Sequence, residues 1–114
     1  MGSYKEHQNL IKRFKLLAVK KIPHARFFDR HVGTFYTRTH HPIKINRKGM
    51  SDLYGIITTP SGLIHVEIEA KTGEARQTYE QRRWQEFIES MGGGYFLLRD
   101  ENETIQQLIE FVSK

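Results

Sequence analysis

The sequence predicts one α/β domain with a mixed central sheet flanked by helices, in the order α-β-β-β-α-β-α. Apolar residues recur at helical spacing in the segments 4–21, 78–91 and 105–112. Runs rich in β-branched and aromatic residues lie between these segments. A chain of 114 residues can bury one hydrophobic core but not two, so we interpret residues 1–114 as a single domain.

The first helix is predicted from Tyr4 to about Lys21, and Pro23 ends it. Its apolar residues have the spacing of an amphipathic helix: Leu10, Ile11, Phe14, Leu17 and Ala18. Glu6 lies one turn before Leu10, at the edge of this stripe, where a side chain could point into a site. A favourable interaction with the helix dipole is the simpler explanation for one glutamate in a first turn.

Residues 25–28 and 33–38 are aromatic and β-branched, which predicts a first strand or two. Residues 39–48 contain a proline and a run of basic residues, which predicts a loop. The interleaved Arg, His, Phe and Tyr side chains suit contact with phosphate and stacking on bases, and they suit an ordinary half-buried hairpin equally well. The pair His40-His41 lacks partner ligands at a recognised spacing, so we interpret it as part of a solvated loop.

The central strand of the predicted sheet is Gly62–Lys71. Successive side chains of a strand point to opposite faces, so its residues fall into two sets. One set is wholly apolar: Ile64, Val66, Ile68 and Ala70. The other set carries Glu67, Glu69 and Lys71. A bound cation would remove the repulsion between these two acids.

A preceding strand is predicted over residues 48–57, with Asp52 near its start. A short turn joins the two strands, so we expect Asp52 to lie beside Glu69 and Lys71. This arrangement predicts an Mg²⁺ or Mn²⁺ site with a lysine next to it. The alternative is a surface salt-bridge triad that contributes little to stability.

A helix is predicted over residues 78–91, closed by Gly92–Gly94. Its expected apolar stripe is Trp84, Phe87, Ile88 and Met91. Gln81 lies on the margin of this stripe, where it can point towards the sheet. Ordinary helix surface explains Gln81 nearly as well.

Residues 95–99 predict a short buried strand, parallel to its neighbour through a right-handed crossover. Asn102 or Thr104 is the expected cap of the last helix. The apolar residues of that helix are Ile105, Leu108, Ile109 and Val112.

The net charge of +5 is divided unevenly along the chain. Residues 1–48 hold twelve Lys and Arg against two acids, a net charge of +10, and residues 49–114 hold six against eleven, a net charge of −5. A basic half favours a polyanion through neutralisation of phosphates, and a solvated surface explains the charge about as well. The chain has no cysteine, no apolar run of membrane-spanning length and no signal peptide. We therefore expect a soluble, intracellular protein.

Three motifs in this structural context resemble the PD-(D/E)XK nuclease pattern: Gly49-x-x-Asp52, Glu69-x-Lys71, and Gln81 ten residues further on. The similarity is greater to virus-type replication-repair nuclease (VRR-NUC) domains, especially the small stand-alone forms of phages and prophages. The similar segments are 27–33, 48–55, 69–73, 80–84 and 92–98. Ser51 stands where the superfamily name has proline, a position without a chemical role.

The resemblance implies a restriction-endonuclease-like core and a metal-dependent DNA endonuclease, selective for branched or junction DNA in replication or repair. Asp52 and Glu69, with the Ala70 carbonyl, would bind one or two Mg²⁺ or Mn²⁺ ions. Lys71 would position the attacking water or offset negative charge on the phosphate. Gln81 would orient Lys71 or that water.

Family members often carry an acid in the first helix, and here Glu6 is the candidate metal ligand, although Gln8 could occupy that position. Glu67 is an extra acid without an assignment, and we expect it to be solvated. The resemblance also implies a homodimer in the cytoplasm of a bacterial host. The candidate DNA-backbone contacts are Arg26, His31, Lys44, Arg47, Lys48, Arg76 and Arg82.

Two other functions fit the sequence. A non-catalytic nucleic-acid-binding module on the same fold would bind DNA without cutting it. A metal-dependent hydrolase of small phosphates would fit the site and leave the basic half unexplained. Only the nuclease predicts metal-dependent scission of DNA that is lost in Lys71→Ala and Asp52→Ala.

Overall fold

The computed structural model describes residues 4–30, 33–45 and 48–113 and, for residues 33–36 and 43–45, the backbone alone. The elements follow in the order α1 (Tyr4–Lys21), β1 (Ala25–Asp29), β2 (Gly33–Tyr36), β3 (Pro42–Ile45), β4 (Leu53–Thr59), β5 (Gly62–Ala70), α2 (Tyr79–Ser90), β6 (Gly94–Leu98) and α3 (Glu101–Val112).

Four strands form the main sheet, in the spatial order β1-β4-β5-β6. β1 pairs with β4 and β4 with β5 in antiparallel orientation, whereas β5 and β6 are parallel. The mixed sheet and the parallel last strand are therefore confirmed. When β2 and β3, which form a separate sheet, are left out, the order of the elements along the chain is the predicted α-β-β-β-α-β-α.

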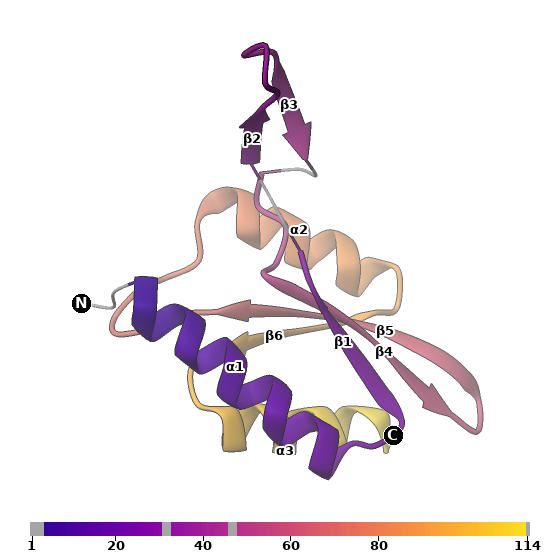
Figure 1. Cartoon of the computed structure of the whole chain (residues 1–114). Helices are drawn as coiled ribbons and strands as arrows, with labels where there is room; N and C mark the ends of the chain where they lie inside the picture. Colours follow the sequence, from indigo (N-terminus) through magenta and orange to yellow (C-terminus); the bar gives the residue numbers. More distant parts are fainter. Residues whose placement is uncertain (1–3, 31–32, 46–47, 114) are drawn as a thin grey trace.

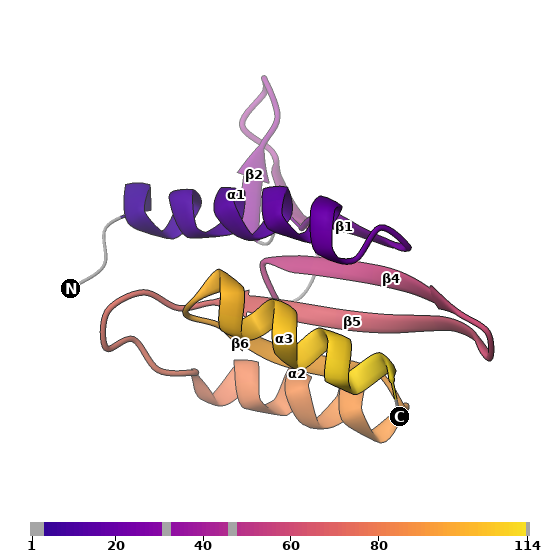
Figure 2. The ribbon, with the colours of Figure 1, turned by 90° about the horizontal axis from the view of Figure 1, so that it is seen from below.

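The helices cover the two faces of this sheet unequally. Figure 1 shows α1 and α3 on one side of the sheet and α2 on the other, and Figure 2 shows α1 and α3 from below. The hydrophobic core lies under α1 and α3, where the apolar side of β5 meets both helices. The largest fully buried side chains there include Phe14, Leu53 and Leu108. The predicted apolar stripes of α1 and α3 are confirmed, with Leu17, Ile109 and Val112 only partly buried.

Residues 42–45 form a strand, so the prediction of a loop there is wrong. β2 and β3 pair in antiparallel register as a separate two-stranded hairpin, which projects away from the main sheet in Figure 1. Its turn is closed by a hydrogen bond of 2.9 Å from Thr37 N to His41 O and by His40 at a φ of 64°. Pro42 pairs at the end of the ladder, where a missing N–H is tolerated.

The apolar stripe predicted for α2 is wrong in part. Ile88 is buried, but Phe87 is 53% exposed and Met91 73% exposed. α2 lies over the sheet face that carries Glu67 and Glu69, so it contacts polar groups where a core helix would contact apolar ones. Phe87 lines an outward hollow of about 310 Å³ beside the helix instead.

The caps of the last two helices differ in how well they were predicted. Thr78 caps the start of α2, and the predicted closure by glycine is confirmed, since Gly92 follows the C-cap with a φ of 89°. The cap of α3 is Asp100, whose side chain accepts a hydrogen bond of 3.0 Å from Glu103 N. The prediction of Asn102 or Thr104 was wrong, because the helix begins at Glu101. Among the described residues, no helix is both long and apolar enough to span a bilayer.

Candidate active site

The register of β4 and β5 brings Asp52 to Glu69. Leu53 pairs with Ile68, so Asp52, one residue earlier, comes opposite Glu69. The Asp52 side chain is fixed there because its Oδ2 accepts a hydrogen bond of 2.8 Å from Ala70 N. The two carboxylates that the sequence predicted to converge therefore do so.

Glu69 is buried among polar groups, with 4% of its surface exposed. Its Oε2 accepts a hydrogen bond of 3.1 Å from Gln81 Nε2 and lies 3.9 Å from Lys71 Nζ. Its Oε1 is buried and makes no hydrogen bond within the described part of the chain. The predicted site residues Asp52, Glu69, Lys71 and Gln81 thus lie together, and one carboxylate oxygen is left for a ligand.

Burial and the neighbouring Asp52 carboxylate raise the pKa of Glu69 to about 9, against the opposing charges of Lys71 and Arg30. When Glu69 carries a proton, it can donate a hydrogen bond to Asp52, which further stabilises the neutral form. Two carboxylates this close disfavour double ionisation unless a cation compensates. The pair therefore holds either a proton or a positive ion.

Gln81 is oriented by the start of α2. Thr78 Oγ1 accepts a hydrogen bond of 3.1 Å from Gln81 N, and Gln81 Oε1 accepts one of 2.9 Å from Thr78 N. This capping box occupies the amide oxygen of Gln81. The amide nitrogen is then left to donate to Glu69, so one side chain caps the helix and contacts the site.

The side chain that α1 contributes is His7, which the sequence interpretation missed. His7 Nε2 lies 3.4 Å from Asp52 Oδ2, and the two side chains are each 27% exposed. Glu6 is exposed, and its role as a metal ligand stays a prediction. A signal was present, because His7 lies three and four residues before Leu10 and Ile11 and so shares their buried face.

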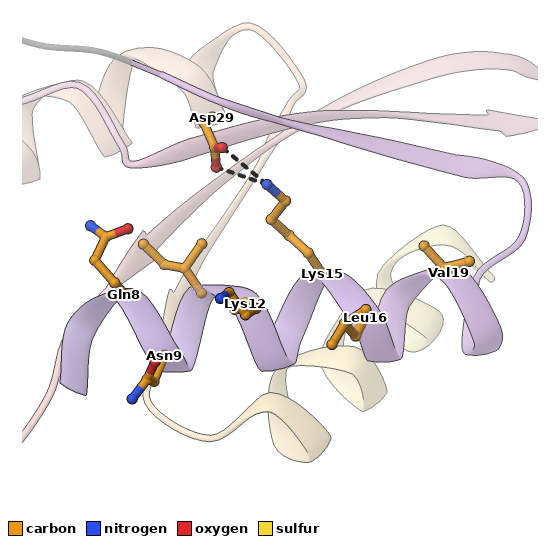
Figure 3. Close-up of a pocket in the computed structure, with 8 residues that line it drawn as sticks. Gln8, Asn9, Lys12, Lys15, Leu16, Val19 and Asp29 are labelled. Atoms are coloured by element: carbon orange, nitrogen blue, oxygen red, sulfur yellow. Dashed lines mark hydrogen bonds and ion pairs between the residues drawn. The ribbon is translucent and has the colours of Figure 1, made fainter. Parts of the chain in front are cut away.

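Gln8 lies on another side of α1. It lines a hollow of about 490 Å³ with Lys12, Lys15 and Leu16 (Figure 3). In that hollow, Lys15 Nζ contacts both carboxylate oxygens of Asp29 at 3.1 and 3.0 Å. Gln8 is therefore not the α1 residue that meets Asp52.

Glu67 is fully buried, so the expectation of a solvated side chain was wrong. Arg30 binds both of its oxygens, with Nη2 to Oε2 at 3.0 Å and a second, shorter contact from Nη1 to Oε1. Trp84 Nε1 donates to Oε1 at 2.9 Å, and His65 Nε2 contacts Oε2. Burial raises the pKa of Glu67, but the hydrogen bonds from Arg30 and Trp84 outweigh it and leave the pKa below its usual value.

The residues present fit a hard divalent cation in one specific way. Within the described residues, no group of three or more His, Cys, Asp or Glu side chains is arranged to hold a metal ion. Mg²⁺ is commonly bound through one or two carboxylates, with waters and substrate phosphates completing its sphere. Asp52 and the unpartnered oxygen of Glu69 meet that requirement, and the role of the Ala70 carbonyl stays a prediction.

The predicted DNA contacts are spread over the molecule. Lys48, Arg76 and Arg82 are exposed. Lys48 lies beside α2, where it lines the hollow of about 310 Å³ together with Tyr79 and Glu80. Arg26 donates hydrogen bonds to the carbonyls of Pro23 and Ala25, near the end of β1 that is far from the site. His31 and Arg47 lie outside the described residues, and Lys44 is described by its backbone only.

Comparisons with protein-family models, with curated proteins and with solved structures find no significant match for this chain. The resemblance to VRR-NUC domains therefore rests on the motifs and stays a hypothesis.

Proposed function

We propose that this protein is a divalent-metal-dependent DNA nuclease that hydrolyses phosphodiester bonds. The observation that carries the proposal is the pairing of Asp52 with Glu69, where one buried carboxylate oxygen has no hydrogen-bond partner among the residues that the structure describes. Lys71 and Gln81 contact the same glutamate. Two adjacent acids, of which Glu69 is buried, together with a lysine and an amide from α2, are more than a structural salt bridge requires.

Asp52 and Glu69 would bind the cation, Mg²⁺ or Mn²⁺, with their hard oxygen ligands. A divalent ion held there supplies Lewis-acid polarisation of the scissile phosphate and lowers the pKa of a bound water. Because the pair disfavours double ionisation, binding should displace the proton of Glu69. The site would therefore bind metal more tightly as the pH rises towards 9, the pKa of Glu69.

Lys71 would act on the reacting phosphate. Its side chain is 11% exposed and its backbone N–H donates to Leu98 O at 2.9 Å, so the ammonium group is confined near Glu69. A fixed positive charge next to a phosphate offsets negative charge that develops during attack by water. Gln81, held by the capping box, would keep Glu69 oriented.

Charge and shape support DNA as the substrate. The sequence from Arg30 to Ser51 contains no acid and has five Lys and Arg and three His. The β2–β3 hairpin lies within this segment, and both ends of the segment meet beside the site, where Arg30 N donates to Asp52 O at 2.8 Å. A two-stranded ribbon fits the major groove of DNA, so a duplex bound at the site would have the hairpin within reach.

Cleavage of labelled junction, flap, single-stranded and duplex DNA tests the proposal, each with Mg²⁺, Mn²⁺ or EDTA. Scission by the wild type with metal, its loss in EDTA, and its loss in Asp52→Ala and Lys71→Ala are expected. Glu74→Gln changes an exposed acid that has no role in the proposal, so it should cut like the wild type. DNA binding without scission under every condition would favour the non-catalytic module.

The homodimer implied by the resemblance is part of the same proposal. Tyr79 and Phe87 on α2 and Met91 at its C-cap are each more than half exposed and offer apolar surface for a second copy. Sedimentation of the wild type at micromolar concentration should show a dimer. A monomer throughout would contradict this part of the proposal and leave the nuclease intact.

A further inference from the structure

Arg30 comes directly after β1, and its side chain is nearly buried, with 10% exposed. The guanidinium group binds the two oxygens of Glu67 on β5. It also lies over the Tyr54 ring, 4.8 Å from the centroid, and 5.7 Å from that of Trp84. Because Trp84 also donates to Glu67, the guanidinium is held on several sides by the sheet and by α2.

The same residue contacts the chain that leads into the proposed site. Arg30 N donates to the carbonyl of Asp52 at 2.8 Å, and Arg30 Nη1 lies 3.4 Å from the carbonyl of Ser51. The β1–β4 ladder ends at the pair Asp29 and Leu53, so the backbone bond continues this pairing by one residue. Both peptide carbonyls that flank the Cα atom of Asp52 are therefore contacted by Arg30.

We infer that Arg30 is a positioning residue for the Asp52–Glu69 pair, and that buried Glu67 serves to fix Arg30. This inference rests on the proposed function. Asp52 directly precedes β4, so the contacts of Arg30 hold its backbone, and the hydrogen bond from Ala70 N then holds its carboxylate beside Glu69. Glu67 is saturated by Arg30, Trp84 and His65 and is not a metal ligand in this arrangement.

This positioning role requires the planar guanidinium group of arginine, which has several N–H donors in fixed directions. Arg30→Lys keeps the positive charge but cannot bind both oxygens of Glu67 and reach the Ser51 carbonyl at once. Groups that orient metal ligands typically change metal affinity by about 10- to 100-fold when they are lost. We therefore expect the Kd for Mn²⁺ to rise at least about tenfold in Arg30→Lys.

Calorimetric titration with Mn²⁺, beside cleavage measured across Mn²⁺ concentrations, tests this inference. In Arg30→Lys the Mn²⁺ needed for half-maximal cleavage should rise with the Kd, while KM for DNA stays near the wild-type value. Arg83→Lys is the matched control, because Arg83 is exposed and contacts only neighbours on α2 among the described residues, Glu86 at 3.8 Å and Tyr79 Oη at 3.3 Å. This variant should bind Mn²⁺ like the wild type. A folded Arg30→Lys with wild-type Kd and metal dependence would overturn the inference.

A second variant separates positioning from folding. Removing only one partner of a buried ion pair can unfold a protein, whereas replacing both with uncharged groups is often tolerated. Arg30→Met combined with Glu67→Gln should therefore fold, with circular dichroism like the wild type, and still bind Mn²⁺ weakly. Wild-type Mn²⁺ affinity in the double variant would overturn the inference. A wild type that neither binds Mn²⁺ nor cuts DNA would instead overturn the proposed function itself.

Discussion

Glu67 and Glu69 leave the same face of β5 two residues apart, both buried, and their pKa values are displaced in opposite directions. Glu67 meets a guanidinium and an indole N–H, which stabilise its ionised form. Glu69 meets a second carboxylate, Asp52, and one of its oxygens accepts no hydrogen bond from the described part of the chain. Glu67 is therefore ionised in a structural ion pair, whereas Glu69 can release its proton when a cation binds.

Without divalent ions, the protein should become less stable as the pH rises from about 5 to about 9. The pKa of Glu69 is about 9 in the folded state and near its usual 4.5 in the unfolded chain. The folded state therefore keeps a proton that the unfolded state releases. Each pH unit in this window should lower the free energy of unfolding by up to about 1.4 kcal/mol. Thermal unfolding in EDTA across this range measures the slope.

The matched variants of this experiment are Glu69→Gln and Glu74→Gln. Glu69→Gln removes the titrating group, so its stability should depend much less on pH above 5. Glu74→Gln changes an exposed acid and should keep the wild-type slope. Saturating Mn²⁺ should also flatten the wild-type slope, because the ion replaces the proton. An identical slope in wild type and Glu69→Gln would place the responsible proton elsewhere.

Glu67→Ala should be strongly destabilising, by about 3–5 kcal/mol, because it leaves the guanidinium of Arg30 buried without a counter-charge. Asp29→Ala also removes one partner of an ion pair, but the Lys15–Asp29 pair is exposed and its loss should cost about 1 kcal/mol or less. Urea unfolding at pH 7 compares the two. Equal losses in both variants would contradict the buried role of Glu67.

The dependence of stability on pH below 5 provides a second test of Glu67. Its pKa is lowered in the folded state, so its contribution to stability is present above the usual value of 4.5 and is lost as the pH falls through the lowered folded pKa. Wild type should therefore lose stability at acid pH more steeply than Glu67→Gln does. Urea midpoints measured from pH 5 down to pH 2.5 would show whether the two curves converge.

Two variants of Gln81 should separate its role in capping α2 from its hydrogen bond to Glu69. Gln81→Ala loses one half of the capping box and the bond to Glu69, so it should lower both stability, by about 1 kcal/mol, and cleavage. Gln81→Glu can still accept the hydrogen bond from Thr78 N but cannot donate to Glu69. It should keep the cap and still lose cleavage. Wild-type cleavage by Gln81→Glu would mean that the hydrogen bond to Glu69 has no role in the reaction.

Arg38→Ala and Lys48→Ala should weaken DNA binding through loss of phosphate contacts. Both residues are exposed, Arg38 at the hairpin turn and Lys48 beside α2. Each lost contact should reduce the slope of log Kd against log salt by about 0.9. Lys20→Ala, near the other end of α1 from His7, is the charge-matched control and should keep the wild-type slope. Fluorescence anisotropy at several salt concentrations measures all three, and equal slopes in all variants would exclude the hairpin face.

Sequence patterns were sufficient for elements whose side chains repeat along a single segment. The 3.6-residue period identified α1 and α3, and the two-residue period of β5 placed Val66 and Ile68 on the core face, as the structure shows. The motif spacing also brought Asp52 to Glu69 correctly, because a short turn between neighbouring antiparallel strands leaves little freedom in their register.

The predictions failed for the exposed side of α2 and for the strand β3. Phe87 reads as core in α2, but the sheet face beneath that helix is polar, so Phe87 is exposed. The strand β3 was predicted as a loop because it is short and contains a proline and a basic residue, and these local signals outweighed its pairing with β2.

The sequence by itself determined the order of the elements, the side of β5 that is apolar and the acids that converge, because these follow from local periods and short connections. The tertiary structure alone decided which of the two glutamates is ionised in an ion pair and which has a raised pKa. Arg30, directly after β1, and Trp84, on α2, both donate hydrogen bonds to Glu67. Neither of them donates a hydrogen bond to Glu69, which is bound by Gln81 instead. The environment of a buried charge depends on groups distant in sequence, and the fold alone brings those groups together.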